Sequence, residues 1–204
     1  MAYHSKRIRV LLWAVFFLLA SCEHSFHHNE PVVSYHIPLG MGYLKQHDMP
    51  RAKRHLLIAL DEMPTSPDAY GAMAYYLEKT GNMEAARRYY EKALSLNPHY
   101  GPALNNYGAF LCRQALYEMA DRYFRKAVIE PRYEHPAEAY ENAGLCATLE
   151  GNTQRARDYF LKALKEDPLR QSTLKALMVL ERDQGNTQQV QVYVKRLSNL
   201  TKDQ

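Results

Sequence analysis

Turn-forming residues and tryptophan are scarce in this 204-residue sequence. It contains 9 Gly, 10 Pro and a single Trp, whereas Tyr occurs 16 times. So few chain-reversing residues argue against an all-β fold, which needs a turn after every short strand. Apolar residues make up 47% and charged residues 24% of the chain, a balance that excludes global disorder. The length suits one ordinary domain or one small array of repeats.

A basic surplus is missing from most of the chain. The formal net charge is +4, but Lys6, Arg7 and Arg9 lie within the first 21 residues, which contain no acid. Subtracting these three from the 26 Lys and Arg residues leaves 23 basic residues against 22 acidic ones, a net charge of +1. Nucleic-acid-binding proteins carry a basic surplus on the folded part. We therefore predict no nucleic-acid partner.

The motifs of common catalytic sites are also absent. The sequence has no phosphate-binding glycine loop, no HExxH metal motif and no GxSxG nucleophile elbow. His24, His27 and His28 are close in sequence, but nothing in the surrounding residues fixes the geometry that a metal site requires. We predict a protein that is not an enzyme and that uses no cofactor, no metal and no small-molecule substrate.

The N-terminus has the pattern of a bacterial lipoprotein signal. Its basic residues precede ten uninterrupted apolar residues, Leu11 to Ala20, whereas a membrane-spanning helix takes about 20. Leu19-Ala20-Ser21-Cys22 then resembles a lipobox, in which small residues precede a Cys that receives lipid. We predict a signal peptide over residues 1–21, a lipidated Cys22, and a flexible tether over residues 22–33. The alternatives are an ordinary signal peptide with a chance Cys and an uncleaved short anchor.

Residues 34–204 repeat one skeleton of paired helices. The marker residues Ala52, Ala86 and Ala120 recur at one constant step, and the step to Ala156 is longer by two, so the third loop carries two extra residues. A constant step of about 34 residues is typical of tetratricopeptide (TPR) repeats. We predict an all-α, TPR helix-hairpin solenoid of about five repeats, four of them clear and the last a degenerate cap.

Each class of marker residue has a packing role. Small residues in the first helix of a unit allow the second helix to approach, bulky residues fill the space around them, and prolines stop the second helix. Gly-Asn pairs mark the turns between helices. The small residues are Gly40, Gly108 and Gly144; the bulky ones are Tyr90, Phe124 and Phe160; the prolines are Pro64, Pro98 and Pro168.

A TPR array has no enclosed active site, and its first helices line a concave groove that binds other proteins. The repeat phase places there Met41, Leu44, Tyr75, Glu78, Asn105, Ala109, Arg113, Glu141, Leu145 and Thr148. Our candidate partner-binding residues are Tyr75, Asn105, Asn106, Arg113, Glu141 and Asn142. The alternative for Asn106 and Asn142 is hydrogen bonding between repeats. Glu138 occupies the place where a carboxylate-clamp TPR needs Lys, which argues against that subtype.

Three segments carry a family resemblance. They are NNYGAFLC (Asn105 to Cys112), the long loop from Glu130 to Pro136, and YENAGLCATLEGN (Tyr140 to Asn152). Together they resemble the type IV pilus biogenesis/stability lipoprotein family (PilW/PilF), which are secretin pilotins. Several members of that family have six TPR units, whereas five are counted in this sequence.

The resemblance implies a lipid-anchored outer-membrane protein that faces the periplasm. It also implies that the protein assists type IV pilus biogenesis and twitching motility by helping the pilus secretin to localise or assemble. Glu23, rather than Asp, follows the lipobox Cys, which by the same resemblance favours the outer membrane. The alternative is a general cell-envelope TPR adaptor for another outer-membrane or peptidoglycan assembly.

Two cysteines remain after Cys22. Cys112 and Cys146 lie on the first helices of neighbouring repeats, at positions that differ by two in the repeat phase, and an oxidising compartment permits disulfides. Packed helix axes are about 8–10 Å apart, whereas a disulfide needs Cα atoms within about 7 Å. A disulfide and two buried thiols are therefore both compatible with the sequence.

Overall fold

The computed structural model describes residues 35–202, within a compact unit that runs from Ser34 to Gln204. The predicted signal peptide, Cys22 and the tether lie outside the described residues. Over residues 35–202 the regular elements are ten α-helices, with no β-strand. None of these helices combines the length and apolar character needed to cross a bilayer. The predicted all-α class is confirmed.

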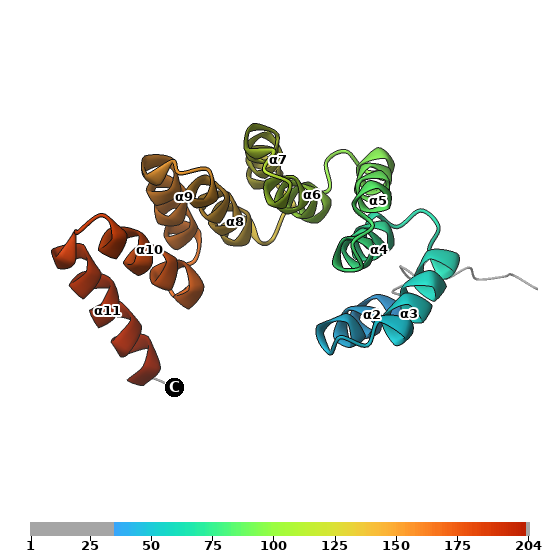
Figure 1. Ribbon diagram of the computed structural model, residues 1–204, viewed down its shortest axis with the longest axis horizontal. Helices are drawn as coiled ribbons and strands as arrows, with labels where there is room; N and C mark the ends of the chain where they lie inside the picture. Colours follow the sequence, from blue (N-terminus) through green and yellow to red (C-terminus); the bar gives the residue numbers. More distant parts are fainter. Residues whose placement is uncertain (1–34, 203–204) are drawn as a thin grey trace, which may run out of the picture. The chain divides into compact units, whose positions relative to one another are not determined.

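The ten helices form five consecutive pairs (Figure 1). Within each pair the two helices pack against each other, and each pair then packs against the next one along the chain. The fifth pair confirms the predicted degenerate repeat. The helices are α2 (His36–Lys45), α3 (Met49–Glu62), α4 (Pro67–Lys79), α5 (Met83–Leu96), α6 (Gly101–Arg113), α7 (Tyr117–Ile129), α8 (Pro136–Leu149), α9 (Thr153–Glu166), α10 (Gln171–Asp183) and α11 (Thr187–Lys202).

Gly-Asn pairs lie between the first and second helices in three of the repeats, at Gly81-Asn82, Gly151-Asn152 and Gly185-Asn186. Gly81 and Gly151 have φ of 83° and 84°, a left-handed conformation that glycine adopts without steric cost. Asn82 and Asn152 then accept hydrogen bonds from the backbone N–H groups of Ala85 and Arg155, which caps the second helix. The prolines also act as predicted, because α3, α5 and α9 end at Glu62, Leu96 and Glu166, two residues before Pro64, Pro98 and Pro168.

The glycines of the first helices allow the second helix to pack closely. A Cβ atom on Gly40 would lie 2.8 Å from the side chain of Leu56, and one on Gly144 would lie 2.6 Å from the ring of Phe160. Gly108 faces Phe124 in the same way at 2.9 Å. At such distances an added Cβ atom would force the facing side chain to move, so these glycines favour the close packing within a pair.

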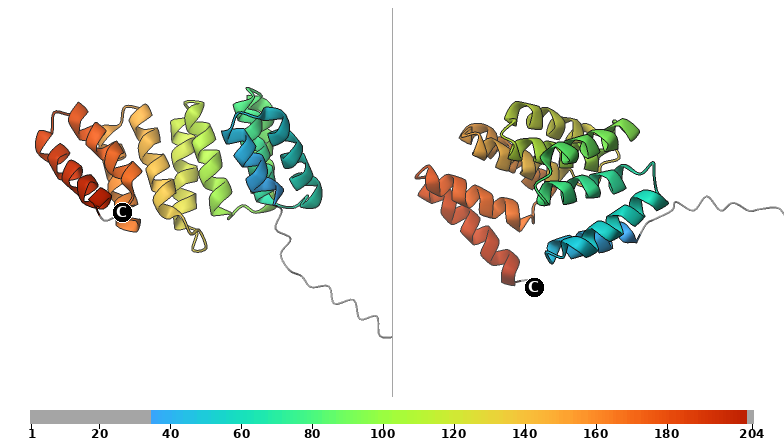
Figure 2. Two further views of the ribbon diagram at one scale, coloured as in Figure 1. Left: turned by 90° about the horizontal axis from the view of Figure 1, so that it is seen from below. Right: turned by 45° about the vertical axis from the view of Figure 1, so that its right-hand side comes forward.

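The pairs follow an arc within this unit. The even-numbered helices lie along its inner side (Figure 1), and α2, α4, α6 and α8 contact one another in succession. The odd-numbered helices lie on the outer side, and the left view of Figure 2 shows the pairs stacked in chain order. Because an arc is shorter on its inside, the inner helices touch while the outer helices diverge.

The two extra residues of the third loop carry Tyr133 into the interior. Its ring is buried and lies against Gly101, where a Cβ atom would be only 2.5 Å away. Tyr133 packs in a cluster with Leu104, Ala127 and Ala139. The insertion therefore adds a wedge between the third and fourth repeats.

Candidate functional site

Polar contacts cross the inner side of the array at the last three junctions between repeats. At the junction of the second and third repeats, the carboxylate of Glu78 accepts two hydrogen bonds from the guanidinium of Arg113, one of them 2.8 Å long. Tyr90 donates a third at 3.4 Å. Burial lowers the pKa of Arg113, but the hydrogen bonds and charge of Glu78 outweigh it and raise that pKa. Glu78 is 7% exposed, so Arg113 compensates a buried charge.

The junction of the third and fourth repeats uses amide groups. Asn105 is 2% exposed. Its side chain donates to Glu138 at 3.3 Å and accepts from Asn142 at 3.0 Å. Two of the predicted binding residues, Asn105 and Asn142, are thus hydrogen-bonded to each other across the junction.

At the junction of the fourth and fifth repeats, one carboxylate collects three donors. Glu141 accepts from Arg170 and from Ser172, both at 2.7 Å, and from Thr173. Burial raises the pKa of Glu141, but these hydrogen bonds outweigh it and hold the pKa below its ordinary value. The carboxylate is therefore charged and fully engaged within the array.

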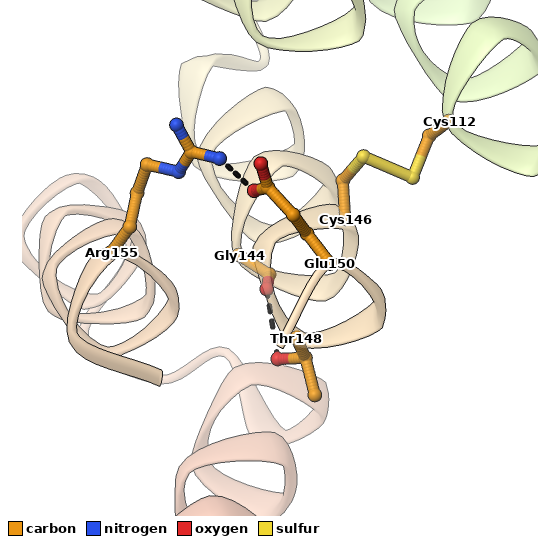
Figure 3. Close-up of a disulfide and its surroundings, with 6 residues drawn as sticks. All are labelled: Cys112, Gly144, Cys146, Thr148, Glu150 and Arg155. Carbon is orange, nitrogen blue, oxygen red and sulfur yellow. Dashed lines mark hydrogen bonds and ion pairs between the residues drawn. A yellow bond between two sulfur atoms is a disulfide. The ribbon is translucent and has the colours of Figure 1, made fainter. Parts of the chain in front are cut away.

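A disulfide reinforces the junction of the third and fourth repeats. Cys112 and Cys146 are bonded, with their Cα atoms 5.7 Å apart (Figure 3). Close by, Glu150 forms an ion pair with Arg155, and Thr148 donates to the carbonyl of Gly144 at 3.0 Å. The bond joins α6 to α8 directly, on the inner side of the arc.

Asn106 and Tyr75 remain available on the surface. Asn106 is exposed, and Tyr75 is half-buried with the ammonium group of Lys79 5.1 Å from its ring centroid. The six predicted binding residues therefore divide into four that join repeats and two that face solvent. A binding role for any of the six stays a prediction.

An apolar residue recurs at one position of every first helix. Leu145 and Val179 are 44% and 40% exposed, and Met41, Tyr75 and Ala109 occupy the equivalent positions of the first three repeats. The sequence prediction included four of these five but missed Val179. Their shared spacing is the signal that locates it. An apolar row of this kind can hold the side chains of an extended or helical peptide.

The titratable residues of the array show two kinds of evidence about metal binding and ion pairing. Over residues 35–202 no group of three or more His, Cys, Asp or Glu side chains is placed to hold a metal ion. The lowered pKa values of Glu141 and Glu181 are explained by hydrogen bonds from Arg, Ser, Thr and Asn side chains within the array. These shifts are those of structural ion pairs.

Comparison with known sequences identifies the repeats. Two family models described as tetratricopeptide repeat match residues 67–100 and 111–170. An uncharacterised protein of Haemophilus influenzae is 33% identical over 144 residues, which are 70% of this chain and 80% of that protein. The type IV pilus assembly protein PilF of Pseudomonas aeruginosa is 34% identical over 130 residues, 64% of this chain. The alignment spans about half, 52%, of the length of that PilF.

Solved structures agree with these matches. A Pseudomonas aeruginosa PilF structure superposes with a TM-score of 0.71 and 29% identity, covering 80% of this chain and 74% of that one. The crystal structure of PilW superposes with a TM-score of 0.72 and 26% identity, covering 82% of this chain and 76% of that one. That PilW is described as a widely conserved type IV pilus biogenesis factor.

Proposed function

This chain belongs to the tetratricopeptide-repeat family that includes PilF and PilW, and on that premise we propose that it assists type IV pilus biogenesis by binding protein partners. The partner we propose is the pilus secretin, whose localisation or assembly the protein helps. The observation that carries the proposal is the likeness to PilF and PilW, which extends over about four-fifths of the chain.

The inner surface supports binding rather than catalysis. Its carboxylates and amides are engaged between repeats, and one apolar side chain per repeat remains along the arc. Leu145 and Val179 are exposed, whereas Met41, Tyr75 and Ala109 are half-buried. We assign this row to the contact with the secretin, because apolar side chains at regular spacing suit the apolar face of a partner segment.

The membrane anchor belongs to the same proposal. The lipobox that ends in Cys22, followed by Glu23, supports a lipid-anchored protein at the outer membrane that faces the periplasm. Several acyl chains give stable anchoring where a single one gives only marginal binding.

Deletion of the gene tests the proposed function. We expect loss of secretin multimers and of surface pili, and co-purification of the secretin with the tagged chain. Complementation by a Cys22→Ala variant separates anchoring from binding: it should still bind the secretin in detergent extracts but fail to restore pili. Normal multimers and pili in the deletion strain, with another envelope protein co-purifying, would instead support a general adaptor.

The apolar row of Met41, Tyr75, Ala109, Leu145 and Val179, called the inner row below, has a matched control within the chain. Leu145→Arg places a charge in the row, whereas Leu161→Arg places the same charge at an equally exposed position of α9; the two leucines are 44% and 47% exposed. We expect only Leu145→Arg to abolish co-purification of the secretin. Equal loss in both variants would remove the inner row from the proposal.

A further inference from the structure

A second surface lies on the outer side of the array. Because the outer helices diverge, a cleft of ≈ 760 Å³ opens between α7 and α9, and Tyr140 of α8 contributes to its lining. It faces away from the inner row and takes no part in the contacts between first helices. The contacts that join the repeats therefore do not explain why these residues line the cleft.

Four cations line this cleft. Arg122, Arg125 and Lys126 come from α7, and Lys162 comes from α9. Within residues 35–202 none of the four forms an ion pair. All four residues are exposed. Their charges are thus gathered in one place without a direct ion pair to any described carboxylate.

Three of the four acids on α7 and α9 have other partners, and the fourth, Glu166, ends α9 and is not among the residues that line the cleft. Asp121 accepts a hydrogen bond from Tyr159 at 2.5 Å, and Glu118 pairs with Arg155 at 3.5 Å. Asp158 accepts from Gln154 at 3.0 Å. Burial, followed by the hydrogen bond to Asp121, raises the pKa of Tyr159, so its hydroxyl group stays protonated and donates.

Tyrosine rings underlie the cations. The ammonium group of Lys162 lies 5.9 Å from the ring centroid of Tyr140 and 5.5 Å from that of Tyr159, and the ammonium group of Lys126 lies 5.4 Å from that of Tyr123. These contacts hold the cations over apolar surface. They also occupy ring faces on which nucleic-acid bases would have to stack.

Apolar side chains extend the lining. Ile129 is 74% exposed and Met119 is 40% exposed, and both line the cleft with the cations. A ligand that only carried negative charge would leave these two side chains in water. A ligand with both carboxylates and apolar side chains would use the whole surface.

We propose that this outer cleft binds an acidic segment of a partner protein, in which carboxylates alternate with apolar side chains. The carboxylates meet the cations of α7 and α9, and the apolar side chains cover Ile129 and Met119. Arginines are suited to this role because the guanidinium group binds a carboxylate through two parallel hydrogen bonds. The site is separate from the inner row and does not depend on the pilus role.

The preceding repeat supplies a matched control. Arg88 and Lys92 of α5 lie one repeat step before Arg122 and Lys126, at the equivalent positions. There Arg88 pairs with Glu84 at 3.2 Å, and Glu91 stands where α7 has Arg125. The double changes Arg122→Ala/Lys126→Ala and Arg88→Ala/Lys92→Ala remove the same charge from neighbouring repeats.

The test uses residues 23–204 and a fluorescein-labelled peptide in which glutamates alternate with leucines. Fluorescence anisotropy measures its affinity for the wild-type protein and for both double variants. We expect Arg122→Ala/Lys126→Ala to weaken binding about tenfold, and Arg88→Ala/Lys92→Ala to weaken it less than about twofold. A peptide with glutamine in place of glutamate should not bind.

Other outcomes overturn the proposal. Equal weakening by the two double variants means that the peptide follows net charge and not the cleft. Absence of saturable binding to the wild-type protein removes an acidic peptide as the ligand. Phosphatidylglycerol vesicles or single-stranded DNA that bind through Arg122 and Lys126, while the peptide does not, assign the cleft to a membrane or to nucleic acid instead.

Discussion

The inner and outer sides of the third and fourth repeats use charged side chains in opposite ways. On the inner side, Arg113 and Glu141 are hydrogen-bonded across junctions to neighbouring repeats. On the outer side, Arg122 and Arg125 face a cleft with no carboxylate paired to them in the described part of the chain. Charges that join neighbouring repeats are thus separated from charges that are available to bind a partner.

The difference follows from the curvature of the array. First helices that touch bring their polar groups within hydrogen-bond distance, and buried polar groups must then find partners. Second helices that diverge leave room between them, and their side chains stay in water. Substitutions of the charged and amide residues that join repeats on the inner side should therefore change stability, and substitutions of the outer cations should change binding of the acidic partner.

Loss of the disulfide should have the largest effect on stability. It joins α6 to α8 across a sequence separation of 34, and closing a loop of that length in the unfolded chain stabilises the fold by about 3–4 kcal/mol. We expect Cys112→Ala/Cys146→Ala to lower the free energy of unfolding by about that amount, measured by urea denaturation. Dithiothreitol should destabilise the wild-type protein similarly and leave the double variant unchanged.

Arg113→Ala should have the next largest effect. It leaves the buried carboxylate of Glu78 without its cation, which we expect to cost about 2–3 kcal/mol. Arg122→Ala is the matched change on the outer side, because it removes an arginine that has no ion pair among the described residues. Equal destabilisation by the two changes would contradict the division between the two sides.

Glu141→Gln should lower the free energy of unfolding by a smaller amount, and that amount should depend on pH. The carboxylate accepts three hydrogen bonds, and we expect its replacement to cost about 1–2 kcal/mol at neutral pH. Because the pKa of Glu141 is lowered in the folded state from 4.5, its contribution is present above that ordinary value and is lost as the pH falls through the folded pKa. The stability gap between wild type and variant should narrow on acidification, as measured by urea denaturation at successive pH values.

The outer cations should contribute least to stability. Arg125→Ala removes an exposed side chain with no ion pair over residues 35–202, and we expect the free energy of unfolding to stay within about 0.5 kcal/mol of the wild-type value. Thermal denaturation followed by circular dichroism measures the change. A markedly lower melting temperature would show that Arg125 has a structural role.

The sequence was sufficient to predict the fold because the markers of each repeat act locally. Small residues, bulky residues and helix-stopping prolines recur at one step, and each determines contacts within its own helix pair. Two turns depart from the pattern. His47 and Ala115 have φ of 60° and 58° in the places where the other repeats have glycine. This left-handed conformation costs conformational energy in residues other than glycine. Nothing in the neighbouring sequence predicts it.

The candidate site was less predictable because its contacts depend on the angle between repeats. Glu78 and Arg113, on the first helices of neighbouring repeats, could each have faced solvent, and only the curvature of the array brings them together. The tyrosines and cations of the outer cleft do have a recurring signal in the sequence. Tyr89, Tyr123, Tyr159 and Tyr193 recur at the repeat step, and each is followed three residues later by a cation, namely Lys92, Lys126, Lys162 and Arg196.

The most direct test is to map where the acidic peptide lies on the protein. A peptide that carries a photoreactive benzophenone group can be crosslinked to residues 23–204, and mass spectrometry then identifies the attached residues. The division between the two sides predicts crosslinks to α7 between Met119 and Ile129, and to α9 near Lys162. Crosslinks concentrated on Asn106, Leu145 and Val179 would contradict it, because the acidic partner would then occupy the inner side.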